Sequence, residues 1–243
     1  MAPVPGRRTY SQRSLHGQVA HDLGRRIVGG GYPEGSLLPN EEELSTELQV
    51  SRTALREAIK VLTAKGLIAS RPKIGTKVRP RSDWNMLDPD VLDWTIRTGN
   101  LTVFSRKLLE MRDMIEPAAA GLAAQNHTAE QAAELSDAYQ AMAESTTHQD
   151  WSTADFRFHQ AMLTATGNEL IGALGTLIEN ALITSFDYSA RHARKPKESL
   201  PLHKDVLDHI LARDANSATK AMDALLLDAR EALDRIAAAQ AAG

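Results

Sequence analysis

Residues 37–78 read LLPNEEELSTELQVSRTALREAIKVLTAKGLIASRPKIGTKV. A short helix is predicted after Pro39, and Ser51 is a good N-cap for a longer helix that ends at Gly66. The longer helix has one apolar face, which consists of Leu55, Ile59 and Leu62. Two extended pieces, LIASR and TKVRP, follow and are joined by a turn at Gly75, which predicts a small hairpin.

The preceding residues complete a small domain. A helical pattern runs from Leu15 to Ile27 and is ended by GGGYPEG at 29–35. Three short helices followed by a hairpin predict a winged helix-turn-helix over residues 15–80, a fold typical of DNA-binding proteins. Residues 1–81 contain 14 Lys and Arg against 7 Asp and Glu, a net charge of +7. Because the whole chain has a net charge of −3, residues 82–243 have a net charge of −10. A basic part joined to an acidic part indicates that only the first meets a polyanion.

The rest of the chain is predicted to be helical. Residues 1–14 are expected to form a flexible basic arm, and residues 81–98 a linker and docking helix. The docking segment contains three apolar side chains that we expect to seat one domain on the other: Trp84, Leu87 and Trp94. Residues 99–243 show helical patterns at about 101–124, 128–145, 149–166, 168–187, 198–213 and 215–241. The predicted fold class is mostly α, with a winged helix-turn-helix, a small β-hairpin wing and an all-α bundle of about six to seven helices.

Composition excludes several classes of protein. The chain of 243 residues has no Cys, which excludes disulfides, thiol nucleophiles and thiolate zinc sites. No apolar run approaches the ~20 residues that span a bilayer, and the N-terminus lacks the apolar stretch of a secretory signal. A cytoplasmic protein without a membrane partner is therefore expected.

The longer helix of the first domain has an outward basic face. With its apolar side chains inward, Arg52, Thr53 and Arg56 point outward near the helix N-terminus, where side chains of a recognition helix reach base edges. Ser51 and Thr53 are placed to anchor phosphates, and Lys73 or Arg71 in the wing to reach the DNA backbone or a minor groove. The alternative is an ordinary solvated basic helix, because exposed Arg pairs are common.

Residues 37–78 resemble the N-terminal signature of the GntR family of bacterial transcription regulators. The resemblance rests on Leu38-Pro39, Val50-Ser51-Arg52, Leu55-Arg56-Glu57-Ala58, Leu62, Gly66-Leu67 and Gly75-Thr76. It implies that Arg52, Thr53 and Arg56 face the major groove and that the wing tip at Gly75 and Thr76 contacts the minor groove. Glu42 stands where this family often has Arg. That departure removes one DNA contact or changes the base preference, since a carboxylate repels phosphate but can accept a hydrogen bond from cytosine N4.

Three later segments resemble the all-helical FCD-type effector domain of the FadR-like subfamily. They are RDMIEPAAAGLAA (112–124), ADFRFHQAMLTATGNELI (154–171) and PLHKDVLDHILARDANSATKAM (201–222). In many relatives an Asp, two His at these positions and a third His from the last helix bind a divalent metal that holds a carboxylate effector. The resemblance thus assigns Asp155, His159 and His203 to a metal, with zinc favoured. The third His position is Leu225 here.

The residues themselves leave three interpretations of this cluster open. Asp155 and His159 stand four residues apart, so both side chains lie on one helix face within reach of a single ion, and His203 lies on an inward stripe. The three residues bind a divalent metal, or they hydrogen-bond an organic acid without metal, or they form a satisfied polar core.

Two arginines are candidates for binding an anionic effector. Arg112 lies beside the core stripe of its helix, and Arg230 lies on the last helix. The alternative for each is an ion pair, with Glu116 for Arg112 and with Asp234 for Arg230, because oppositely charged side chains four residues apart pair on a helix.

These features favour a homodimeric repressor rather than an enzyme. Two winged domains would bind the half-sites of a pseudopalindromic DNA operator, and a small carboxylate effector would shift them. The segment SDWNMLDPDVLDW (82–94) also resembles the linker of FadR-like repressors of sugar-acid operons, which makes a hydroxylated carboxylate the leading effector. The alternatives are a metal-dependent enzyme acting on an organic acid and an effector-free architectural DNA-binding protein.

Overall fold

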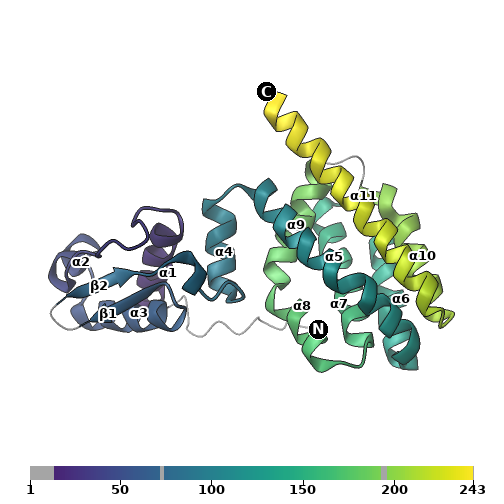
Figure 1. Cartoon of the computed structure of the whole chain (residues 1–243), viewed down its shortest axis with the longest axis horizontal. Helices are drawn as coiled ribbons and strands as arrows, with labels where there is room; N and C mark the ends of the chain where they lie inside the picture. The colour runs from purple at the N-terminus through teal and green to yellow at the C-terminus, as the bar shows by residue number, and fades with distance from the viewer. Residues whose placement is uncertain (1–13, 72–73, 193–195, 243) are drawn as a thin grey trace. The chain divides into compact units, whose positions relative to one another are not determined.

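The computed structural model describes residues 14–71, 74–192 and 196–242, which form two compact units divided between Gly99 and Asn100 (Figure 1). The unit before the division contains four α-helices, a two-stranded antiparallel sheet and a short 3-10 helix among its described residues. The described part of the second unit is entirely helical apart from its connections. The predicted fold class is therefore confirmed.

The first unit is a winged helix-turn-helix followed by one further helix. Its helices and strands are, in chain order, α1 (Leu15–Val28), α2 (Glu41–Glu47), α3 (Arg52–Ala64), β1 (Ile68–Arg71), β2 (Gly75–Val78), η1 (Arg81–Asp83) and α4 (Pro89–Thr98). The strands pair from Ile68 with Val78 to Arg71 with Gly75. The described residues of the expected basic arm amount to Ser14, so the rest of that prediction lies outside the described structure.

Local capping explains where α2 and α3 begin. The side chain of Asn40 accepts hydrogen bonds from the backbone N–H groups of Glu42 and Glu43, and the carboxylate of Glu43 accepts one from the N–H of Asn40, which forms a capping box. Ser51 caps α3 by accepting from the N–H of Ala54 at 3.2 Å. The Ser51 cap fixes the first turn of α3, where Arg52 lies.

The first unit's core includes the helix that follows the wing. Trp84 and Trp94 are buried together with the apolar side chains of α1 and α3, whereas Leu87 is 43% exposed. Trp94 packs against Gly24, where a Cβ would lie 2.4 Å from the indole ring. Its Nε1 donates to Nδ1 of His21 at 2.9 Å. The residues around α4 are therefore part of the core of the first unit.

A buried ion cluster joins the end of α3 to the beginning of α4. The side chain of Lys65 is 3% exposed, and its Nζ lies 2.7 Å from a carboxylate oxygen of Asp88 and 2.8 Å from one of Asp90. Asp88 also caps α4 through the backbone N–H groups of Asp90 and Val91. Through these ion pairs, Lys65 connects the C-terminal end of α3 to the beginning of α4.

The second unit is a helical bundle in which the two longest helices lie side by side and run in opposite directions (Figure 1). Its elements are α5 (Leu101–Asn126), α6 (Ala129–Glu144), α7 (His148–Ala165), α8 (Glu169–Leu177), α9 (Glu179–His192), η2 (Pro196–Ser199), α10 (Leu200–Leu211) and α11 (Ala215–Ala242). The most extensive contact between two helices is that of α5 with α11. Small residues permit this approach, since a Cβ at Gly121 would lie 2.7 Å from Oγ1 of Thr219.

The predicted helix at 168–187 differs from the structure. The chain forms two helices there, α8 and α9, which are separated at Ile178, where φ is −104° and ψ is 10°. Neither Gly nor Pro stands at the break, so the residue pattern carries no signal of it. Both helices pack on α7, and tertiary packing has overridden a continuous helical pattern.

Within the described ranges no single helix combines the length and apolarity needed to cross a membrane, although the bent pair 169–176 and 181–189 reaches that threshold by length and composition.

Candidate ligand cavity and DNA-reading face

A cavity of about 130 Å³ lies inside the second unit. Helices α5, α7, α9, α10 and α11 all contribute to its lining. The polar lining residues are Ser105, Arg112, Asp155, His159, Ser185, Ser189, Glu198, Ser199, His203, Asp228 and Arg235. The structure therefore brings four of the five predicted effector residues to one cavity: Arg112, Asp155, His159 and His203.

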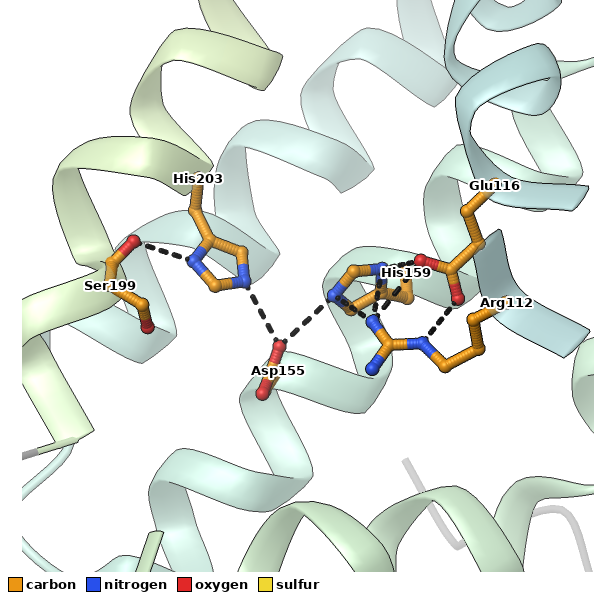
Figure 2. A network of polar contacts seen from close by, with 6 residues as sticks. All are labelled: Arg112, Glu116, Asp155, His159, Ser199 and His203. Atoms are coloured by element: carbon orange, nitrogen blue, oxygen red, sulfur yellow. Dashed lines mark hydrogen bonds and ion pairs between the residues drawn. The ribbon is translucent and has the colours of Figure 1, made fainter. Parts of the chain in front are cut away.

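Asp155 lies between the two histidines (Figure 2). Its Oδ1 is 3.3 Å from Nε2 of His159 and 3.1 Å from Nε2 of His203. The ligand atoms of the three residues lie within 4.8 Å of one another. Both imidazoles are buried, and Asp155 is 14% exposed, so this cluster faces the cavity rather than bulk water.

The hydrogen bonds of the two rings are suited to metal binding. Nδ1 of His203 lies 2.9 Å from the carbonyl oxygen of Ser199, and Nδ1 of His159 lies 2.9 Å from Oε2 of Glu116. Since both partners are acceptors, each Nδ1 carries a proton, and each Nε2 faces the carboxylate of Asp155. An unprotonated Nε2 and a carboxylate oxygen repel unless a proton or a metal ion lies between them. Oriented histidines of this kind fit a divalent metal.

Arg112 and Glu116 form a buried pair behind His159. Arg112 donates from Nε to Oε1 of Glu116 at 2.7 Å and from Nη2 to Oε2 at 3.1 Å. The same Nη2 lies 3.1 Å from Nε2 of His159, and the guanidinium stacks 4.6 Å from the ring centre of Phe186. Arg112 thus lines the cavity and also makes the ion pair that the sequence offered as its alternative role.

The surrounding charges keep this network ionised. Burial alone would raise the pKa of Glu116, but Arg112 and His159 outweigh it and lower that pKa to about 2. Burial would likewise raise the pKa of Asp155, but hydrogen bonds from His159 and His203 hold it well below its usual range. Burial lowers the pKa of His159, but Glu116 more than offsets this and raises it. Two carboxylates are therefore available to balance cations at this site.

Arg230 lies away from the cavity. Its guanidinium is about half exposed and pairs with Asp113, and it is absent from the cavity lining. Asp234, its expected partner, pairs instead with Arg106 at 2.6 Å. Arg230 follows the cavity-lining Leu225 by five residues, which on a helix is a rotation of roughly 140° and turns it to another face.

Several lining residues carry no signal in the sequence. Ser105 and Ser185 hydrogen-bond to each other at 2.9 Å, and Ser189 lies one turn further along α9. Arg235 lines the cavity from α11. Glu116, which is not a lining residue, could be identified from the sequence as a partner of Arg112 because it follows Arg112 by four residues on the same helix.

The first unit presents the predicted basic face on α3. The side chains of Arg52 and Arg56 are 60% and 63% exposed and lie one helical turn apart. Ser51 and Thr53 are also exposed at this end of α3. Each arginine is paired with α2: Nη2 of Arg52 lies 3.1 Å from Oε1 of Glu42, and Nε of Arg56 lies 2.8 Å from Oε2 of Glu41.

The wing holds the remaining predicted DNA contacts. Gly75, the first residue of β2, has a φ of 108°, which L side chains rarely adopt and which glycine adopts without strain. Oγ1 of Thr76 lies 2.8 Å from Oγ of Ser70 across the strand pair. Lys73 lies outside the described residues.

Family models match both units. Residues 15–78 match the family described as bacterial regulatory proteins, gntR family, and residues 107–228 match the FCD domain. The first match ends with β2, and the second begins in α5 and ends in α11. The second includes all four of the predicted effector residues that line the cavity.

Relatives of similar length match nearly the whole chain. The chain is 36% identical to YieP, an uncharacterised HTH-type transcriptional regulator of Escherichia coli (strain K12), over 92% of this chain and 97% of that protein. It is 32% identical to the galactonate operon transcriptional repressor of the same organism, over 90% of this chain and 96% of that protein. The solved structure of Lar from Listeria monocytogenes has a TM-score of 0.63 at 18% identity, covering 93% of this chain and 99% of that chain, which shows a common fold.

Proposed function

The chain belongs to the GntR family of bacterial regulatory proteins and carries an FCD domain, and on this premise we propose that it is a homodimeric, cytoplasmic repressor controlled by a small carboxylate. It is a DNA-binding transcription regulator, and regulators of this family bind DNA operators and effector metabolites, usually as dimers. The repressor role is supported by the likeness to the galactonate operon repressor.

The observation that carries this proposal is the convergence of Arg112, Asp155, His159 and His203 on one buried cavity. A guanidinium and a cation-binding cluster at the same cavity are complementary to a carboxylate. Zinc is the favoured ion, with Asp155, His159 and His203 as its protein ligands, and Leu225 supplies no fourth ligand. When bound, the ion would supply positive charge that attracts the carboxylate and leaves coordination positions open to it.

The remaining lining residues favour a hydroxylated monocarboxylate. Ser105, Ser185 and Ser189 offer hydroxyl groups that can donate or accept hydrogen bonds. The acidic side chains of Glu198 and Asp228 also line the cavity and would repel a second carboxylate. A sugar acid has hydroxyl groups for the serines and only one carboxylate. The relative named for galactonate regulation also supports a sugar acid as the effector.

The DNA contacts are assigned to the first unit. Arg52, Thr53 and Arg56 would meet base edges in the major groove, and Ser51 would anchor a phosphate. Gly75 and Thr76, with Lys73 beside them in the sequence, would lie at the minor groove. Two copies of this unit in a homodimer would bind the two halves of a pseudopalindrome.

Control by the effector follows from the number of helices at the cavity. A ligand that contacts five helices of one bundle favours the arrangement in which all five close on it. To move the equilibrium between two states from 1:99 to 99:1, it must bind one state about 10⁴-fold more tightly. We assign this difference in affinity to contacts of the effector with Arg112 and with the cluster of Asp155, His159 and His203.

Selection from a random duplex pool, followed by binding assays, tests the proposal. We expect the protein to enrich an inverted repeat, to bind it as two protomers and to lose affinity as salt rises. With zinc present, galactonate or gluconate should release the duplex and raise the melting temperature, whereas succinate and galactose should not. A chain that enriches no sequence, or that turns over the sugar acid, would contradict the proposal.

A further inference from the structure

The exposed basic face of α3 is electrically balanced by carboxylates of its own unit. Arg52 pairs with Glu42 and Arg56 pairs with Glu41. One turn further along, Nζ of Lys60 lies 2.8 Å from Oε1 of Glu57. The cations that would approach DNA from α3 are thus each held by an acid, although residues 1–81 as a whole are basic.

Glu42 differs from its neighbours in the first turn of α2. Glu43 is occupied by the capping box, where its carboxylate accepts from the N–H of Asn40 at 3.0 Å. Glu41 pairs with Arg56, one turn inside α3, and its side chain is 44% exposed. Glu42 is 77% exposed and contacts Arg52, the first residue of α3. Of the two carboxylates that pair with arginines of α3, Glu42 is therefore the more accessible, and it lies beside the end of α3 that would enter a groove.

The ion pair of Arg52 with Glu42 can distinguish base edges from phosphates. An exposed ion pair is weak, so a guanine that offers O6 and N7 can replace the carboxylate as the partner of Arg52. A phosphate at the same place would lie beside Glu42 and be repelled by it. A cytosine can instead donate from its N4 amino group to the carboxylate.

We propose that Glu42 is a specificity-determining residue of the DNA interface, which accepts a hydrogen bond from a cytosine amino group next to the guanine bound by Arg52. This inference rests on the proposed function, because it requires that α3 enters the major groove. It assigns Glu42 two effects: it favours one base pair, and it weakens binding to DNA that lacks that base pair.

The test compares Glu42→Ala with Glu57→Ala. Both changes remove one carboxylate that pairs with a cation of α3, but Glu57 lies farther from the helix N-terminus and partners Lys60. Each variant and the unmodified full-length chain are taken through selection from a random duplex pool. Their Kd values are then measured for the selected duplex, for its single-base-pair substitutions and for an unrelated duplex at two salt concentrations.

We expect Glu42→Ala to lose about tenfold discrimination at one cytosine-containing base pair, in line with the usual range for a specific base contact. Its affinity for the unrelated duplex should rise several-fold, because a charge that repels phosphate is gone. Glu57→Ala should keep the discrimination at every base pair. Equal melting temperatures of the variants exclude an effect through folding.

The results separate two failures. If the unmodified chain enriches no sequence, the proposed function fails and this inference fails with it. If it enriches a sequence and Glu42→Ala shows the same discrimination at every base pair, the inference about Glu42 alone is wrong. A loss of discrimination shared equally by Glu57→Ala would also overturn it, because general charge would then explain the effect.

Discussion

Nδ1 of His159 lies 2.9 Å from Oε2 of Glu116, a carboxylate of α5 outside the cavity lining (Figure 2). This contact fixes the ring so that its other nitrogen faces Asp155. Glu116 also holds the guanidinium of Arg112 through two hydrogen bonds. One buried carboxylate therefore orients both the candidate metal ligand and the candidate effector-binding arginine.

Replacing Glu116 should weaken metal binding although Glu116 is not a ligand. In Glu116→Gln the neutral amide holds the ring and the guanidinium less strongly, and we expect about a 10- to 100-fold loss in zinc affinity, the usual effect of removing such a partner. Zinc titration in competition with a chelator measures it. Glu110→Gln, an exposed position on the same helix, is the control and should behave like the unmodified chain.

Replacing a ligand should remove the metal. Protein purified without chelators is expected to contain about one zinc or similar ion per chain, and His159→Ala and His203→Ala should each lower this content strongly. Elemental analysis of the folded proteins checks it. His209→Ala on α10 should retain the ion, because His209 is not part of the Asp155 cluster. Equal metal content in all four proteins would refute the assignment.

A histidine at position 225 should tighten the site. Leu225 is 4% exposed and lines the same cavity as the Asp155 cluster. Leu225→His would offer a fourth protein ligand and a third nitrogen, so zinc should dissociate more slowly on addition of a chelator than from the unmodified chain. The same substitution combined with His159→Ala shows whether the new histidine acts together with the original ligands. An unchanged dissociation rate in Leu225→His would contradict the expectation.

Removing an arginine of α3 should reduce specific DNA binding. Arg52→Ala is expected to cost about 1–3 kcal/mol on the selected duplex and much less on an unrelated one, because a base contact is lost. Gel shift at fixed salt measures the difference. Arg97→Ala is the matched control, since Arg97 is equally exposed at 60% and pairs with Asp93 on α4. A similar loss in both variants would show that only general charge matters.

The buried cluster between α3 and α4 should be a main source of stability in the first unit. Lys65→Met leaves Asp88 and Asp90 without the shared ammonium ion, and breaking a buried pair in this way typically costs about 3–5 kcal/mol. Urea unfolding followed by tryptophan fluorescence reports it, since Trp84 and Trp94 lie in this core. Lys60→Met, which removes an exposed pair, should change the unfolding midpoint little.

The sequence by itself determined the fold class and the faces of single helices. Caps at Asn40 and Ser51, the turn at Gly75 and the apolar period of α3 are local features, so they could be read without a structure. The same holds for Asp155 and His159, because residues four apart share a face of one helix. The broken helix at Ile178 could not be predicted, since no residue type marks it.

Only the tertiary structure decided which of these faces meet. His203, Glu116 and Asp155 come from three helices, and their distances depend on how those helices pack rather than on any spacing in the chain. Packing also decided which face of α11 turns to the cavity, and that face carries Arg235 but not Arg230. A helical period fixes the direction of a side chain about its own axis, but the axis itself is positioned by the long-range burial of apolar surface.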